Sequence, residues 1–137
     1  MDAGHRLTDF AVDNRTKGTR VAAQVRAAAR FGARLRGLIG QTLSPAAGLL
    51  IVRCHGVHTF GMRHAIDLAF LDPDGRVLVL QRSCPPNRIS AWVPMARYVL
   101  EVAPDTLQRS ATTIGDQLVW PSPASRSDSS SPGALHQ

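Results

Sequence analysis

The sequence predicts an α+β domain: a compact, β-rich fold with a small, barrel-like mixed sheet and two short helices. Short apolar stretches, separated by polar or turn residues, recur along the middle of the chain, as expected of strands. The turn sequence Asp72-Pro73-Asp74-Gly75 lies between two of these stretches and is typical of a β-hairpin. Helical spacing or a helix-start residue occurs at only two places, so strands dominate the prediction.

Two strands are predicted in the first half of the core, over residues 20–27 and 49–53, because apolar side chains recur there at the spacing of strands. Between them, Phe31, Leu35 and Leu38 lie at positions i, i+4 and i+7, which places them on one face of a helix. This helix is the first of the two that the sequence predicts.

The second half of the core is predicted to be mostly strands. Their expected ranges are 57–60, 67–72, 75–81, 97–102 and 117–120. Pro85-Pro86 interrupts the pattern and begins an irregular loop over 87–96. Pro104 suits the first turn of a short second helix over 105–110.

One globular domain is predicted over residues 20–120. Residues 1–19 are predicted to be a weakly ordered extension, since Phe10 and Val12 are almost their only apolar anchors. The tail over 121–137 contains six serines and three prolines, and it buries too little to offset its ordering entropy. We therefore expect this tail to be disordered.

The net charge of +6 is concentrated in the first half of the chain, where no acidic residue occurs between Asp13 and Asp67. Fifteen of the sixteen basic residues are arginine, which together with abundant alanine indicates a GC-rich coding bias. Such a bias raises the net positive charge without any selection for binding to a polyanion. No RNA-binding motif accompanies the arginines, so the sequence argues against a nucleic-acid partner.

The amino-terminal residues include no apolar leader, and no stretch approaches the roughly 18 apolar residues of a membrane span. We expect a soluble, cytoplasmic protein. In a reducing compartment, Cys54 and Cys84 are expected to be free thiols.

The 14 residues from Cys54 to Asp67 form a polar cluster that holds most of the unusual chemistry of the chain. Its candidate ligand-binding residues are His58, Thr59, Phe60, Met62, Arg63 and Asp67. Binding sites combine apolar walls with a few convergent polar groups, and this segment has both. Arg63 could hold an anionic group while Asp67 orients Arg63 or His58. We predict that His58, Thr59, Arg63 and Asp67 converge, with Gly61 permitting the tight turn.

A structural network is the alternative interpretation of the same residues, with Asp67 and Thr59 satisfying buried backbone groups. The cluster also contains residue types that bind metals, but no pair has the spacing of a zinc finger or of a helical site. We predict no metal and no cofactor. Cys54 could act as a nucleophile only beside a base, and a cysteine after an apolar strand is often simply packed.

Five blocks of sequence resemble the domain of unknown function 192 family. They are RLRGLIG at 34–40, GLLIVRC at 48–54, VHTFGMRHAIDLAFLDPDGRV at 57–77, ARYVLEV at 96–102 and IGDQL at 114–118. The resemblance implies a compact β-rich fold with no established activity. The chain departs from the family pattern at three places: Gly56 replaces a common Ser, His64-Ala65 replaces an aromatic residue and Pro, and Ala103-Pro104-Asp105 replaces a Pro-Ala-Gly turn.

The function that we expect is a small-ligand-binding or accessory module with its site around residues 58–67, which would take a small molecule or a protein partner. An enzyme of hydrolase type, using His58 and Asp67 with or without Cys54, is the main alternative. The family resemblance implies one more, an accessory role near a pilus or secretion system. Fold alone does not decide between them.

Overall fold

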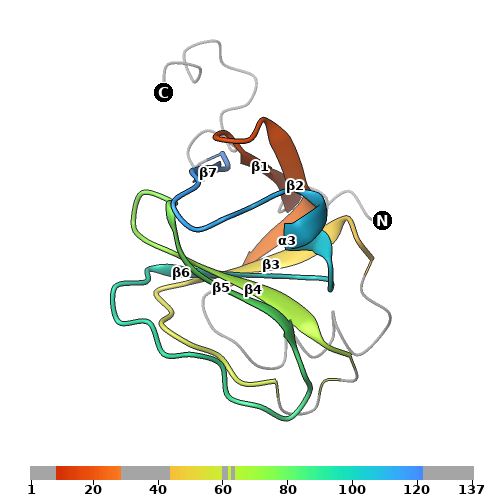
Figure 1. Ribbon diagram of the computed structural model, residues 1–137, viewed down its shortest axis with the longest axis vertical. Coiled ribbons are helices and arrows are strands. Elements are labelled where there is room, and N and C mark those ends of the chain that lie inside the picture. The colour runs from red at the N-terminus through yellow and green to blue at the C-terminus, as the bar shows by residue number, and fades with distance from the viewer. Residues whose placement is uncertain (1–8, 29–43, 60–61, 63, 122–137) are drawn as a thin grey trace.

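One curled, mixed sheet of seven strands makes up most of the fold (Figure 1), and this computed structural model describes residues 9–28, 44–59, 62 and 64–121. The strands are β1 (Asp9–Asn14), β2 (Thr19–Ala28), β3 (Ala47–Val52), β4 (Ile66–Leu71), β5 (Val77–Cys84), β6 (Tyr98–Val102) and β7 (Leu118–Val119). Their order in the sheet is β5-β4-β6-β3-β2-β1-β7. Strands β2 and β3 run parallel, and the other neighbours run antiparallel.

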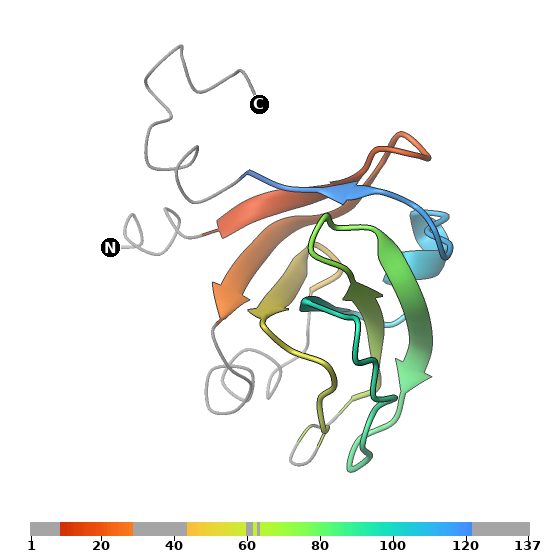
Figure 2. The same ribbon diagram turned by 90° about the vertical axis from the view of Figure 1, so that its left-hand side faces the viewer.

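The sheet curls into a half-barrel whose two edges meet at one end, where β7 comes over the start of β5 (Figure 2). The amide of Val77 donates to the carbonyl of Asp116 at 2.9 Å, and the amide of Leu118 donates to the carbonyl of Gly75 at 3.0 Å. Gly75 has a φ of +86°, and a Cβ there would lie 2.6 Å from the Leu118 carbonyl oxygen. Glycine is therefore required where the two edges approach each other.

Apolar side chains cover both faces of the sheet, as the full burial of β4 indicates. The loop-covered face, as we call it, includes Leu49, Ile51, Val57, Met62, Ile66, Leu68, Phe70, Cys84 and Val99. The opposite face, here the α3-side face, includes Phe10, Val12, Val25, Leu50, Ala69, Leu71, Leu100, Val102, Leu107 and Leu118. Alternation along each strand divides its side chains between these two faces.

The sequence located most of the strands. The predicted strands over 20–27, 49–53 and 97–102 correspond to β2, β3 and β6, and the predicted hairpin is the β4–β5 pair. Residues 57–59 differ from the prediction, because they form one isolated bridge, between His58 and Ile89, rather than a strand.

Helix is scarce in the described part of the chain, where α3 (Thr106–Arg109) spans four residues. It lies within the predicted second helix over 105–110. The predicted first helix, with Phe31, Leu35 and Leu38, lies outside the described residues. Two short helices are thus not confirmed. No described helix has the length and hydrophobicity needed to cross a membrane.

Strand β1 lies in the region that the sequence analysis assigned to a weakly ordered extension. It pairs with both β2 and β7. Phe10 and Val12 point to the α3-side face and are 6% and 0% exposed, and Asn14 is buried as well. The alternation is present in the sequence, but two apolar residues are too few to indicate a strand without the partner strands that cover them. Residues 1–8 and 122–137 lie outside the described residues.

Candidate functional site

Thr59 fastens the segment 55–59 to the loop 85–97 that packs beside it. Its hydroxyl donates to the Pro85 carbonyl at 2.7 Å and accepts from the Arg88 amide at 2.8 Å. Its own amide donates to the Arg88 carbonyl at 2.8 Å. A buried threonine that satisfies three backbone groups holds two loops in register.

The same two segments also meet at Val57 and Ser90, and they approach each other closely at Gly56. The amide of Val57 donates to the Ser90 hydroxyl at 2.9 Å, and the Ser90 amide donates to the Val57 carbonyl at 2.8 Å. A Cβ at Gly56 would lie 3.0 Å from both the Ala91 carbonyl oxygen and a ring carbon of Trp92. The glycine that departs from the family's common serine therefore matches the close approach of Trp92 in this chain.

Asp67 lies on the opposite side of the sheet from this segment. It pairs with Val102, and its carboxylate accepts from the amides of Ser83 at 2.9 Å and Leu107 at 3.2 Å. Val102 and Leu107 belong to the α3-side face, whereas Val57 and Met62 belong to the loop-covered face.

The prediction that Asp67 converges with His58 and Thr59 is therefore wrong. Alternation along β4 turns residue 67 away from the face on which residues 57–62 pack. Both Asp67 and Thr59 satisfy buried backbone groups, as the structural interpretation expects. The separation also divides the two residues, His58 and Asp67, on which the hydrolase alternative depends.

The other predicted site residues have mixed positions. His58 is half-buried beside Ile89, and Met62 is buried in the loop-covered face. Phe60 and Arg63 lie outside the described residues. A neighbour that was not predicted as a site residue, His55, places its ring Nδ1 2.9 Å from the Ala96 carbonyl oxygen.

Glu101 is the residue that sequence reasoning missed. It lies on β6, in the interior of the sheet, and pairs with Leu49 on one side and Leu68 on the other. Its exposed fraction is 1%, and neither carboxylate oxygen has a hydrogen-bond partner within the described residues. A buried carboxyl group with two unsatisfied oxygens carries a large desolvation cost.

Burial raises the pKa of Glu101 well above its ordinary value, so the carboxyl group favours its neutral form. Burial also raises the pKa of Cys54 and of Cys84, and the negative charge that Glu101 carries when it is ionised raises both further. Both cysteines are free thiols. A raised thiol pKa disfavours the thiolate, which weakens the case for Cys54 as a nucleophile.

The loop over the Glu101 face presents apolar side chains to solvent. Ile89 is 74% exposed, Trp92 is 68% exposed and Met95 is 75% exposed. In the ranges 9–28, 44–59, 62 and 64–121, no group of three or more His, Cys, Asp or Glu side chains is arranged to hold a metal ion.

The fold and this face define a class of protein: a small half-barrel β domain with a buried acid in its sheet and two hydrogen-bonded loops that pack on the same face. The chain belongs to the domain of unknown function 192 family, described as uncharacterized ACR, whose sequence profile matches residues 12–120. It is similar to a UPF0127 protein of Thermococcus sibiricus (strain DSM 12597 / MM 739), with 31% identity over 129 residues, covering 87% of this chain and 80% of that protein.

Two solved structures share the fold. A Sinorhizobium meliloti 1021 protein, provisionally named a transcription regulator, has a TM-score of 0.66 and 21% identity, covering 80% of this chain and 90% of that one. A protein of unknown function from Novosphingobium aromaticivorans DSM 12444 has a TM-score of 0.62 and 22% identity, covering 80% of this chain and 82% of that one. At these identities the likeness concerns the fold alone.

Proposed function

We propose that this chain is a small-ligand-binding module whose site lies on the loop-covered face, with Glu101 as its recognition group. The observation that carries the proposal is the buried Glu101 carboxyl group, which has no hydrogen-bond partner in the described structure. Buried polar groups are nearly always satisfied, and exceptions concentrate at functional sites. A bound ligand would supply the missing partner.

The surroundings of Glu101 support an apolar ligand with a single polar group. Its cross-strand neighbours are Leu49 and Leu68, and Val99 lies on the same side of β6. Ligand sites typically have such apolar walls with few polar groups.

The polar group of the ligand is proposed to be a donor of two adjacent N–H groups, as in an amidine. Both oxygens of Glu101 lack a donor among the described residues. Once a cationic partner favours its ionised form, a carboxylate can accept two parallel hydrogen bonds. No described lysine, arginine or histidine forms an ion pair with Glu101. A cationic ligand would therefore bring the positive charge that none of the described residues supplies.

Benzamidine tests the proposal, with benzamide as a neutral compound of the same shape. Isothermal titration calorimetry should detect benzamidine binding to the wild-type protein, weakened roughly tenfold or more in Glu101→Gln because the charged hydrogen bonds are lost. Asp13→Asn is the matched control, since Asp13 forms an exposed ion pair with Arg20. Equal affinity of Glu101→Gln and wild type for benzamidine would contradict the role of Glu101.

A further inference from the structure

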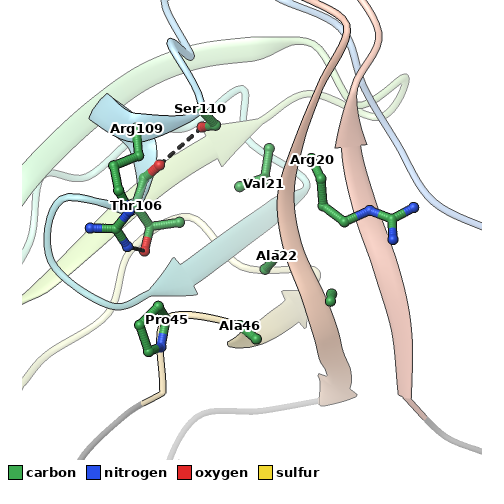
Figure 3. Close-up of a pocket in the computed structure, with 9 residues that line it drawn as sticks. Arg20, Val21, Ala22, Pro45, Ala46, Thr106, Arg109 and Ser110 are labelled. Atoms are coloured by element: carbon green, nitrogen blue, oxygen red, sulfur yellow. Dashed lines mark hydrogen bonds between the residues drawn. The ribbon is translucent and has the colours of Figure 1, made fainter.

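A cavity of about 320 Å³ lies where β2, the segment before β3 and α3 meet (Figure 3). Val21 and Ala22 of β2 line one side, together with Pro45 and Ala46. The other side is lined by Thr106 and Arg109 of α3 and by Ser110, which follows the helix. A volume of this size is at the lower end of the range for small-molecule sites.

The cavity exists because β2 is longer than the strand beside it. Pairing between β2 and β3 begins at Gln24, opposite Ala47. Residues 20–23 of β2 have β1 on one side and, among the described strands, none on the other. No described strand therefore pairs with this stretch of β2 on that side, and α3 faces it across the cavity (Figure 3).

Arg109 brings an uncompensated positive charge to this cavity. Its guanidinium group donates to the Thr106 hydroxyl at 3.4 Å, and it forms no ion pair with a described residue. Arg20 differs, because its guanidinium group is bound to Asp13 at 2.8 Å. Figure 3 shows the Arg20 side chain on the far side of β2, turned away from α3.

We propose that this cavity is a second binding site, separate from Glu101, for a small organic carboxylate. The guanidinium of Arg109 would receive the carboxylate group in a paired geometry, with the Thr106 hydroxyl beside it. The apolar part of the ligand would lie against Val21, Ala22 and Pro45. These walls, which lack charge, favour an organic acid over inorganic phosphate.

Benzoate is the probe for this site, and amide chemical shifts of the ¹⁵N-labelled full chain are the measurement. Benzoate should shift the amides of Val21, Ala22, Ala46 and Ser110, and Arg109→Gln should weaken its binding roughly tenfold or more. Arg76→Gln is the matched control, because Arg76 is an exposed arginine that contacts the Gly115 carbonyl, away from the cavity. It should leave the benzoate affinity unchanged.

Three results would overturn the proposal. They are shifts confined to other parts of the sheet, an unchanged benzoate affinity in Arg109→Gln, and equal shifts with benzamide or inorganic phosphate, either of which would remove the preference for an organic acid. The Glu101→Gln variant should bind benzoate as the wild type does. This last measurement separates the fate of the carboxylate site from that of the site at Glu101.

Discussion

Glu101 on β6 lies directly opposite Leu68 on β4, in the interior of the sheet and beneath the loop-covered face. The sheet therefore holds an ionisable group where its neighbours are aliphatic. The free energy of unfolding therefore depends on the protonation of Glu101, since the neutral acid is far less costly to bury than the carboxylate. The pairing links the proposed ligand site to a measurable effect on stability.

Glu101→Gln should stabilise the protein increasingly as the pH rises. Burial raises the folded-state pKa of Glu101 well above its ordinary value of 4.5. The neutral acid thus contributes its full stability below about pH 4.5, and this contribution is lost as the pH rises toward the folded pKa. The loss is at most about 1.4 kcal/mol for each pH unit.

Urea unfolding of the wild type and of Glu101→Gln measures this effect. We choose pH 5, 6.5 and 8 so that the measurements span the pH range in which the loss grows. The difference in unfolding free energy should widen steadily in favour of Glu101→Gln. Asp13→Asn should show no comparable widening, because the Arg20–Asp13 pair is exposed. A difference that stays constant with pH would show that Glu101 does not titrate differently in the folded and unfolded states.

The sequence predicted local structure better than it predicted which residues meet. The Asp72-Pro73-Asp74-Gly75 turn and the flanking apolar runs were enough to place the β4–β5 hairpin. Because side chains alternate along a strand, Val99 and Glu101 lie on one side of the predicted strand over 97–102. The sequence does not show that this side is buried, because burial depends on segments from distant parts of the chain that pack on it.

The error at Asp67 has the same origin. Sequence proximity to His58 and Thr59 suggested one polar site, but the side of the sheet on which residues 57–62 would pack is a long-range property. A local turn at Gly61 does not determine it. The donors to Asp67, the amides of Ser83 and Leu107, are 16 and 40 residues away in sequence.

Asp67→Asn should destabilise the fold by more than about 1 kcal/mol, because one carboxylate oxygen becomes an NH₂ group facing a buried backbone amide. Binding of benzamidine by the remaining folded protein should be unchanged, since Asp67 lies on the α3-side face. Urea unfolding gives the first quantity and calorimetry below the unfolding transition gives the second. Normal stability with lost binding would restore Asp67 to the ligand site.

Asp116 should make the protein less stable as the pH falls, whereas Glu101 should make it less stable as the pH rises. Burial alone would raise the pKa of this carboxyl, but hydrogen bonds from Asn14, Lys17 and Thr113 outweigh it and lower the pKa to about 2. The folded pKa lies below the ordinary value of 3.8, so the stabilisation is complete above about pH 4 and is lost as the pH falls toward 2.

Asp116→Asn should remove on the order of 2 kcal/mol at neutral pH, with little further loss between pH 4 and pH 2 from this site. Lys17→Met, which removes the amine that is 2.8 Å from Asp116, should cost less because Lys17 is partly exposed. Urea unfolding over this pH range compares both with the wild type. If Asp116→Asn loses stability on acidification as steeply as the wild type, another carboxylate is responsible.

Gly75→Ala should open the contact that brings the two edges of the sheet together. Alanine at a φ of +86° is strained, and its Cβ would lie 2.6 Å from the Leu118 carbonyl oxygen, which is backbone and cannot move aside cheaply. Gly18→Ala is a matched control, since Gly18 has a φ of +71° but a Cβ there would meet nothing within 4 Å. The control should lose only the roughly 1 kcal/mol that a left-handed alanine costs.

The two variants together separate the cost of a strained backbone from the cost of breaking the contact between the two edges of the sheet. Gly75→Ala should lose at least about 2 kcal/mol more than Gly18→Ala in urea unfolding, because the Leu118–Gly75 hydrogen bond is disrupted and the edge strands must part. Hydrogen exchange should then show faster exchange at the amides of Leu118 and Val77, two of the donors that join the edges. Equal losses in the two variants, with unchanged exchange at these amides, would mean that the closure contributes nothing beyond the cost of the turn.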